Sequence, residues 1–237
     1  YYNSEIVPKH PKVNSDFDPL EYSLMLADLL KIRLHVWINT YLIWSAESPP
    51  DDDNHIYFAN YDWIDKPRNS NNDLSDNMIF ISPNHPEVNQ YLEEVIRELI
   101  RNYPTINGLH FDYIRTQNNN YGFNDIGVKL FQDKYSFNPS NIFSNYEKLG
   151  LTTFEKDSLS NIWGIYNQRN ITQLLNNIKL YIDSFHPNIL LSAAVRPNPR
   201  EAKNRWSQDW IHWINEDILD FVVPMNYGIE SHLFIDN

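Results

Sequence analysis

The segment 107–117, which reads NGLHFDYIRTQ, carries the residue types best suited to chemistry. An Asn-Gly turn pair leads into an apolar strand that ends at Asp112, and Arg115 follows three residues later. A carboxylate at the end of a buried strand loses hydration if it points inward, so such an acid is usually paired or functional. We expect Arg115 to pair with Asp112 and keep it ionised; the alternative is a structural pair that ties loop to strand.

Side-chain alternation predicts which residues of this strand share a face. His110 and Asp112 project to one side, whereas Phe111, Tyr113 and Arg115 project to the other. His110 and Asp112 are therefore expected to reach the same site, and Tyr113 and Arg115 to border it from the loop.

A second polar set lies in the run LHVWIN. His35, Trp37 and Asn39 alternate there with apolar residues and share one face of the predicted strand. Such a face indicates a polar interior near the mouth of a sheet or barrel. The alternative is that His35 is a core histidine with its hydrogen bonds satisfied.

Two further strand ends carry candidate ligand contacts. Arg196 follows a strand of small residues, where it could bind a substrate hydroxyl or carboxylate, orient Asp112, or simply lie on the surface. Asn226 and Tyr227 end the run DFVVPMNY and offer directional hydrogen bonds and an aromatic face, although they could equally be core and turn.

Aromatic residues are abundant, with seven Trp and fifteen Tyr. Trp206, Trp210 and Trp213 have helical spacing and are expected in the core. Trp37 lies in a predicted strand, and Trp44 and Trp63 follow strand ends, so these three are better candidates for sugar contacts; the alternative is that they too pack in the core.

These residues need elements to position them, and short apolar runs alternate with helical patterns along the chain. This alternation predicts βαβ units, a parallel sheet and a single domain over residues 1–237. The predicted strands are 32–40, 78–82, 106–114, 189–195 and 218–226, and the predicted helices are 20–30, 86–102, 161–185 and 200–216. The segments 45–77 and 118–150 are polar and are expected to form elaborated loops beside the site.

Composition excludes several classes of function. The net charge of −12 repels nucleic acids, and no apolar run approaches the ~20 residues of a membrane-spanning helix. There is no cysteine, and motifs of nucleotide, serine-hydrolase and zinc-protease sites are missing, so we expect no metal and no cofactor. The oligomeric state is left open.

Several ordered motifs resemble the glycoside hydrolase family 10-like barrel proteins. GLHFDYIR is similar to the family's GIHFDYIRYP strand and RLHVWINTY to its HAWLNPY strand. The segments NQRNITQLL and SQDWIHWINEDILDFVVPMNY resemble the family's later helix and closing strand. The chain departs from the pattern where Thr-Gln replaces Tyr-Pro after Arg115, and where Asn107 replaces an Asp.

The resemblance implies an α/β fold of the TIM-type (β/α)8 barrel class, present as a fragment that lacks its first strand and one or two of its last. It also implies cleavage of glycosidic bonds, with peptidoglycan glycan strands as a substrate of some members, and a periplasmic, secreted or lipoprotein-anchored protein. The candidate site residues fall on the family's strand ends.

Glycoside hydrolysis normally uses two carboxyl groups. An acid held by Arg115 suits the nucleophile or base, so Asp112 is predicted to be catalytic. Glu230 is predicted as the second acid, ahead of Asp209 and Glu47. Two alternatives are a barrel that binds carbohydrate without cleaving it and a domain that binds another protein.

Overall fold

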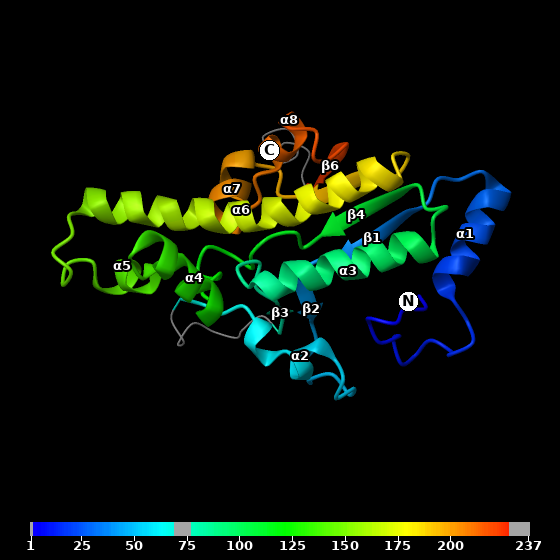
Figure 1. Ribbon diagram of the computed structural model, residues 1–237, viewed down its shortest axis with the longest axis horizontal. Helices are drawn as coiled ribbons and strands as arrows, with labels where there is room; N and C mark the ends of the chain where they lie inside the picture. Colours follow the sequence, from blue (N-terminus) through cyan, green and yellow to red (C-terminus); the bar gives the residue numbers. More distant parts are fainter. Residues whose placement is uncertain (1, 69–76, 228–237) are drawn as a thin grey trace.

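The central feature of the computed structural model is a parallel four-stranded sheet in the order β1-β4-β5-β6 (Figure 1). The structure describes residues 2–68 and 77–227. The strands are β1 (His35–Asn39), β4 (Gly108–Asp112), β5 (Leu190–Val195) and β6 (Phe221–Pro224). Each of the four lies inside a range predicted from the sequence.

Helices cover one face of this sheet. Leu109, Phe111 and Leu191 are fully buried in one apolar core with side chains of α3 (Pro86–Asn102) and α6 (Thr153–Phe185). Both helices run alongside the strands in Figure 1. The remaining helices are α1 (Pro19–Leu30), α2 (Ile56–Ala59), α4 (Asp125–Tyr135), α5 (Pro139–Asn145), α7 (Pro199–Trp206), α8 (Trp210–Asn215) and the 3-10 turn η1 (Tyr61–Trp63).

The helix starts follow from local side-chain chemistry. Asp18 caps α1 by accepting hydrogen bonds from two backbone N–H groups, and Pro19 occupies the first turn, where no donor is needed. Thr152 and Glu155 form a reciprocal capping box at the start of α6. This signal explains why α6 begins at Thr153, eight residues earlier than the start predicted from its apolar stripe alone.

The strand register fixes which side chains share a face. Trp37 pairs with His110, and Asn39 pairs with Asp112. Residues paired in parallel strands project to the same side, so these four side chains lie on the face away from α3 and α6. Trp37 is 68% exposed there, because no helix in the described residues covers that face.

The predicted strand 78–82 has a different role from the one expected. Its core, β3 (Ile79–Phe80), pairs antiparallel with β2 (Leu42–Trp44) in a separate two-stranded sheet. β2 was not predicted, because only two residues separate it from β1. The chain turns between them at Thr40 and Tyr41, whose backbone N–H groups bond to Asp112 and Tyr113.

Two further expectations were wrong. The segment 118–150 contains α4 and α5 besides loop, since Asn124 and Asn138 act as N-caps instead of loop residues. The predicted helix 200–216 is divided into α7 and α8 at Ser207, whose φ of 56° ends the first helix in the left-handed region. Of the helices in the described residues, none has the length and apolar content needed to cross a membrane.

Candidate functional site

The carboxyl ends of the four parallel strands meet at one edge of the sheet, where α/β proteins commonly bind ligands. β1 ends at Asn39, β4 at Asp112 and β5 at Val195, and Asn226 follows β6 by two residues. Among the last residues of these four described strands, Asp112 is the one acid. The candidate site is therefore this edge.

Buried polar atoms without a hydrogen-bond partner gather at this edge. At this edge they are the Thr40 and Thr116 hydroxyls, the Nε atoms of Arg115 and Arg196, and Asn226 Oδ1, whereas Tyr2 Oη, Asp65 Oδ1 and His85 Nδ1 are unpartnered outside these four strand ends. Each of the four strand ends supplies at least one of them. Because buried polar groups are nearly always satisfied, such a concentration indicates that a ligand or water completes their bonds.

Asp112 lies within this group and is 9% exposed. Its Oδ1 accepts a hydrogen bond of 2.7 Å from the backbone N–H of Tyr113. No hydrogen bond within the described residues engages the other oxygen, which is therefore available to a substrate. The side chain projects on the face opposite the helices, as its alternation with Phe111 requires.

Tyr113 adopts a left-handed conformation, with φ of 51°. This conformation is costly for a residue with a large side chain and is typical of functional sites. It ends the strand and aims the backbone N–H at the Asp112 carboxylate. The strand alternation predicted for Tyr113 and Arg115 therefore stops at Asp112.

The pair of Asp112 and Arg115 that we expected is not formed. With the acids of the described residues, Arg115 makes no ion pair within 4.0 Å; its Nη1 donates to Thr116 O at 3.2 Å and Gln117 O at 3.3 Å. The side chain follows its own loop and lies over the Tyr113 ring, 5.0 Å from the centroid. The left-handed turn at Tyr113 changes the path of the loop, which sequence alternation could not anticipate.

Two histidines lie on the same face as Asp112. His110 Nδ1 is 2.9 Å from Ser192 Oγ, and that hydroxyl donates to Leu109 O at 3.3 Å. The hydroxyl therefore accepts from Nδ1–H, which leaves His110 Nε2 as an acceptor for a ligand hydroxyl. Burial lowers the pKa of His110 against the attraction of Asp112, so the ring is neutral at neutral pH.

His35 lies at the other end of its strand and supports the sheet. Its ring covers Gly108, where an added Cβ would be 2.3 Å from Nδ1, so only glycine fits at that position. Burial, followed by repulsion from Arg33, lowers the pKa of His35. This position near the amino ends of the strands separates His35 from the candidate site.

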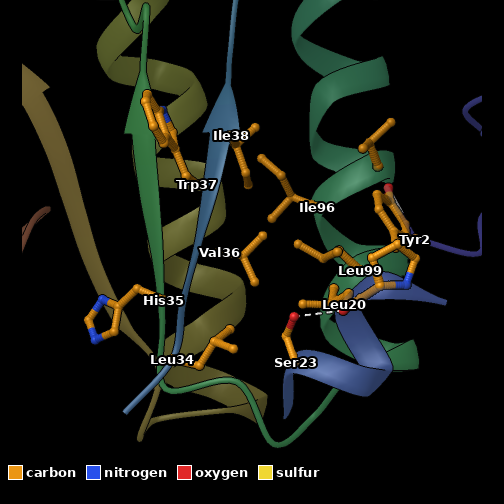
Figure 2. Close-up of a pocket in the computed structure, with 12 residues that line it drawn as sticks. Tyr2, Leu20, Ser23, Leu34, His35, Val36, Trp37, Ile38, Ile96 and Leu99 are labelled. Atoms are coloured by element: carbon orange, nitrogen blue, oxygen red, sulfur yellow. Dashed lines mark hydrogen bonds between the residues drawn. The ribbon is translucent and has the colours of Figure 1, made fainter. Parts of the chain in front are cut away.

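An apolar groove of about 410 Å³ runs along the free edge of β1 (Figure 2). Val36 and Ile38 point into it toward Ile96 and Leu99 of α3, whereas His35 and Trp37 point to the opposite side. The groove has few polar groups and is lined by the amino-terminal part of β1 as well as its centre. It is unsuited to bind a sugar, and it is separate from the strand ends.

The other side chains that were predicted to contact a ligand differ in how exposed they are. Tyr227 is 79% exposed, and Asn226 is half-buried with its unpartnered Oδ1 at the site. Trp63 is only 7% exposed and packs near His85 and Tyr91, so it is a core residue, contrary to the prediction. Glu230 lies outside the described residues.

The weaker acid candidates and one unexpected acid lie elsewhere. Asp209 pairs with Lys203 at 2.7 Å beside α7, and Glu47 is exposed in the loop after β2. Asp65 was missed by the sequence analysis. It is 5% exposed, and its Oδ2 accepts from the Gly122 N–H at 3.0 Å.

Asp65 holds two loops together. Burial raises its pKa to about 7, against hydrogen bonds from Ser82 and Gly122 that lower it. Because the carboxyl group is enclosed, we assign it a structural role. Thr40 and Thr116 were also missed, since a threonine beside a strand end carries no distinguishing sequence signal. Among the described residues, no group of three His, Cys, Asp or Glu side chains is placed to hold a metal.

Comparison with known proteins relates this site to a family. The chain is 22% identical to the glycosyl hydrolase DigH of Escherichia coli K12 and equally to that of Shigella flexneri. Each alignment covers 90% of this chain but only 47% of the relative, so the chain spans about half the length of these proteins. The crystal structure of an α-galactosidase from Lactobacillus brevis overlaps 73% of this chain and 18% of its own, with 14% identity and a TM-score of 0.41.

The match to a family model covers nearly the whole chain. The model of the glycosyl hydrolase-like 10 family matches residues 2–234. This match agrees with the resemblance carried by the strand-end motifs. The chain belongs to the glycosyl hydrolase-like 10 family.

Proposed function

We propose that this chain supplies the substrate-binding edge of a glycoside hydrolase, with Asp112 as a catalytic carboxylate. The observation that carries the proposal is the set of unpartnered buried polar atoms around Asp112 at the strand ends. A sugar offers hydroxyls that both donate and accept, so it can satisfy the two threonine hydroxyls, the arginine Nε atoms and the asparagine oxygen together. Family membership supports the same class of function.

Asp112 is suited to act as the nucleophile or the general base. Its Oδ1 is fixed by the Tyr113 N–H at 2.7 Å, which orients the second oxygen toward a substrate. His110, with Nε2 as an acceptor, and the exposed Asn39 would bind substrate hydroxyls. Trp37, 68% exposed on the same face, would pack against a sugar ring.

A second carboxyl group is needed for hydrolysis. Glu230 remains our proposal for this acid. Asp65 is excluded from the role because it is enclosed by its own loops and cannot reach a substrate.

We also propose that the sheet is part of a (β/α)8 barrel completed by further strands. Both β1 and β6 are edge strands of the parallel sheet in the described residues. Large apolar side chains on the face away from the helices are exposed, including Phe221 at 39% and Val223 at 44%. In a protein with the complete barrel, hydrogen exchange at the outer amides of β1 and β6 should be slow, whereas persistent fast exchange would contradict closure.

The experiment that tests the function uses the full-length protein and a panel of glycans that includes peptidoglycan strands. New reducing ends are measured for the wild type and for Asp112→Asn. We expect the variant to remain folded and to lose activity by roughly a thousandfold or more.

Asp220→Asn is the matched control, because Asp220 is an acid at the amino end of β6 and bonds to the Leu191 N–H at 2.6 Å. It should retain the rate of the wild type. Wild-type rates in Asp112→Asn would remove the assignment.

One observation favours a second function, a barrel that binds carbohydrate without cleaving it. Among the described strand ends, Asp112 has no second acid beside it. For this function, glycans would bind the wild type and Asp112→Asn equally, and no new reducing ends would form with any substrate.

A further inference from the structure

Two arginines lie at neighbouring strand ends in the middle of the candidate site. Arg196 directly follows β5, and Arg115 follows β4 by three residues. β4 and β5 are paired in parallel, so their carboxyl ends are adjacent. Two positive charges are therefore brought close to Asp112.

Aromatic rings and loop carbonyls hold these side chains in place. The Arg196 guanidinium carbon lies 4.4 Å from the centre of the Trp206 ring. Arg115 lies over the Tyr113 ring and donates to the carbonyls of Thr116 and Gln117. Neither side chain needs a ligand to become ordered.

Neither arginine forms an ion pair within the described residues, although Asp112 is near enough to attract the charge of Arg115. No carboxylate lies within 4.0 Å of either guanidinium group among the described residues, and the Nε atom of each is buried without an acceptor. By contrast, Arg205 contacts the same Trp206 ring but pairs with Glu201 at 3.2 Å. Burial and then the charge of Arg196 lower the pKa of Arg115 to about 10, and the opposing attractions of Tyr113 and Asp112 are too weak to restore it.

Buried charges without a counter-ion are unfavourable and are rarely retained unless a ligand supplies the missing charge. We propose that Arg115 and Arg196 form a subsite for the carboxylate of an acidic sugar. A carboxylate matches the planar donor pair of a guanidinium group, and two such groups can bind it together. This inference rests on the proposed function, because it names the class of glycan that the site would take.

The charge of the whole chain strengthens the argument. With a net charge of −12, the protein repels acidic glycans at long range. Binding such a substrate therefore requires a local positive site. The two unpaired arginines provide it where the substrate would meet Asp112.

The test is a binding measurement by ligand-observed NMR on the full chain. The probes are tetragalacturonide and N-acetylmuramic acid, each compared with a neutral counterpart, the methyl ester and N-acetylglucosamine. Inorganic sulfate is a separate probe for a general anion site. We expect at least one acidic sugar to bind about tenfold more tightly than its neutral counterpart, with a preference that declines as salt is added.

The variants Arg196→Gln and Arg115→Gln should each lose most of this preference. Arg205→Gln is the matched control and should keep it, because Arg205 already has its own carboxylate. Arg115 is only 6% exposed, so its replacement can disturb folding. Arg196→Gln, with Arg196 half-buried, provides the decisive variant in that case.

Several results would overturn the subsite. The first is that each acidic sugar binds no more tightly than its neutral counterpart, or that neither binds. The second is a preference for the acidic sugar that survives Arg196→Gln. The third is sulfate binding as strong as that of the acidic sugar. The proposed function fails separately: acidic sugars would bind through the arginines while the wild type cleaves no glycan. Conversely, cleavage of acidic glycans at wild-type rates in Arg196→Gln would keep the function and exclude the subsite.

Discussion

Two groups of buried polar side chains in this molecule differ in whether their hydrogen bonds are satisfied. Between α3 and α6, Asn84 donates to Gly122 O and to Asn167 Oδ1, and it accepts from Asn170, so its amide is fully used. At the strand ends, the threonine hydroxyls and arginine Nε atoms are equally buried but have no partner. The first group stabilises the fold, whereas the second needs a ligand or water to complete its hydrogen bonds.

Asp65 provides the strongest test of this difference between the two groups. It lies in the loops outside the strand ends, yet its Oδ1 has no hydrogen-bond partner. Its pKa is raised from 3.8 to about 7 by burial, so the folded state prefers the protonated form. The stability that it contributes is fully present below pH 4 and is lost as the pH rises through 7. At about 1.4 kcal/mol per pKa unit, the loss is roughly 4 kcal/mol.

Asp65→Asn keeps a neutral acceptor for the Gly122 N–H and removes the titration. We expect the variant to be more stable than the wild type at pH 8 and similar to it at pH 4, as measured by urea denaturation at several pH values. A stability difference that does not change with pH would show that Asp65 is not protonated in the folded protein.

Asn84→Ala examines the satisfied group. The substitution leaves Gly122 O, Asn167 and Asn170 without their partner, so the free energy of unfolding should decrease by about 3 kcal/mol. Asn39→Ala is the control, since Asn39 is exposed on the open face and should affect stability little. Similar losses from the two variants, measured by denaturation, would contradict the difference between the two groups.

The smallest expected changes in stability are those caused by substitutions at two threonines. Thr172 Oγ1 accepts from Trp213 Nε1 at 2.9 Å, whereas Thr40 Oγ1 has no partner. Thr172→Val should lower the free energy of unfolding by about 1–2 kcal/mol, and Thr40→Val should leave it unchanged or slightly increased.

Glycan binding should respond in the opposite sense. It should weaken severalfold in Thr40→Val and stay constant in Thr172→Val, as followed by NMR titration. Destabilisation by Thr40→Val with unchanged binding would mean that its hydroxyl serves the fold.

Much of the architecture could be predicted from the sequence. Continuous apolar runs predicted the four parallel strands, and Pro86 with the stripe that follows predicted α3 over its full range. The failures have physical causes. Short-range capping by Asn124 and Asn138 produced helices in an Asn-rich stretch, and the turn after Asn39 placed Leu42–Trp44 in a second sheet.

By itself, the sequence determined the family, the parallel strands and the position of Asp112 at a strand end, because these depend on periodicity and on motifs local in the chain. Only the tertiary structure decided which polar groups have partners. Thr40, the adjacent residues Arg115 and Thr116, and Arg196 are far apart in sequence and have ordinary neighbours. Their common lack of partners appears only when parallel pairing brings the strand ends to one edge, since hydrogen bonding depends on distance in space.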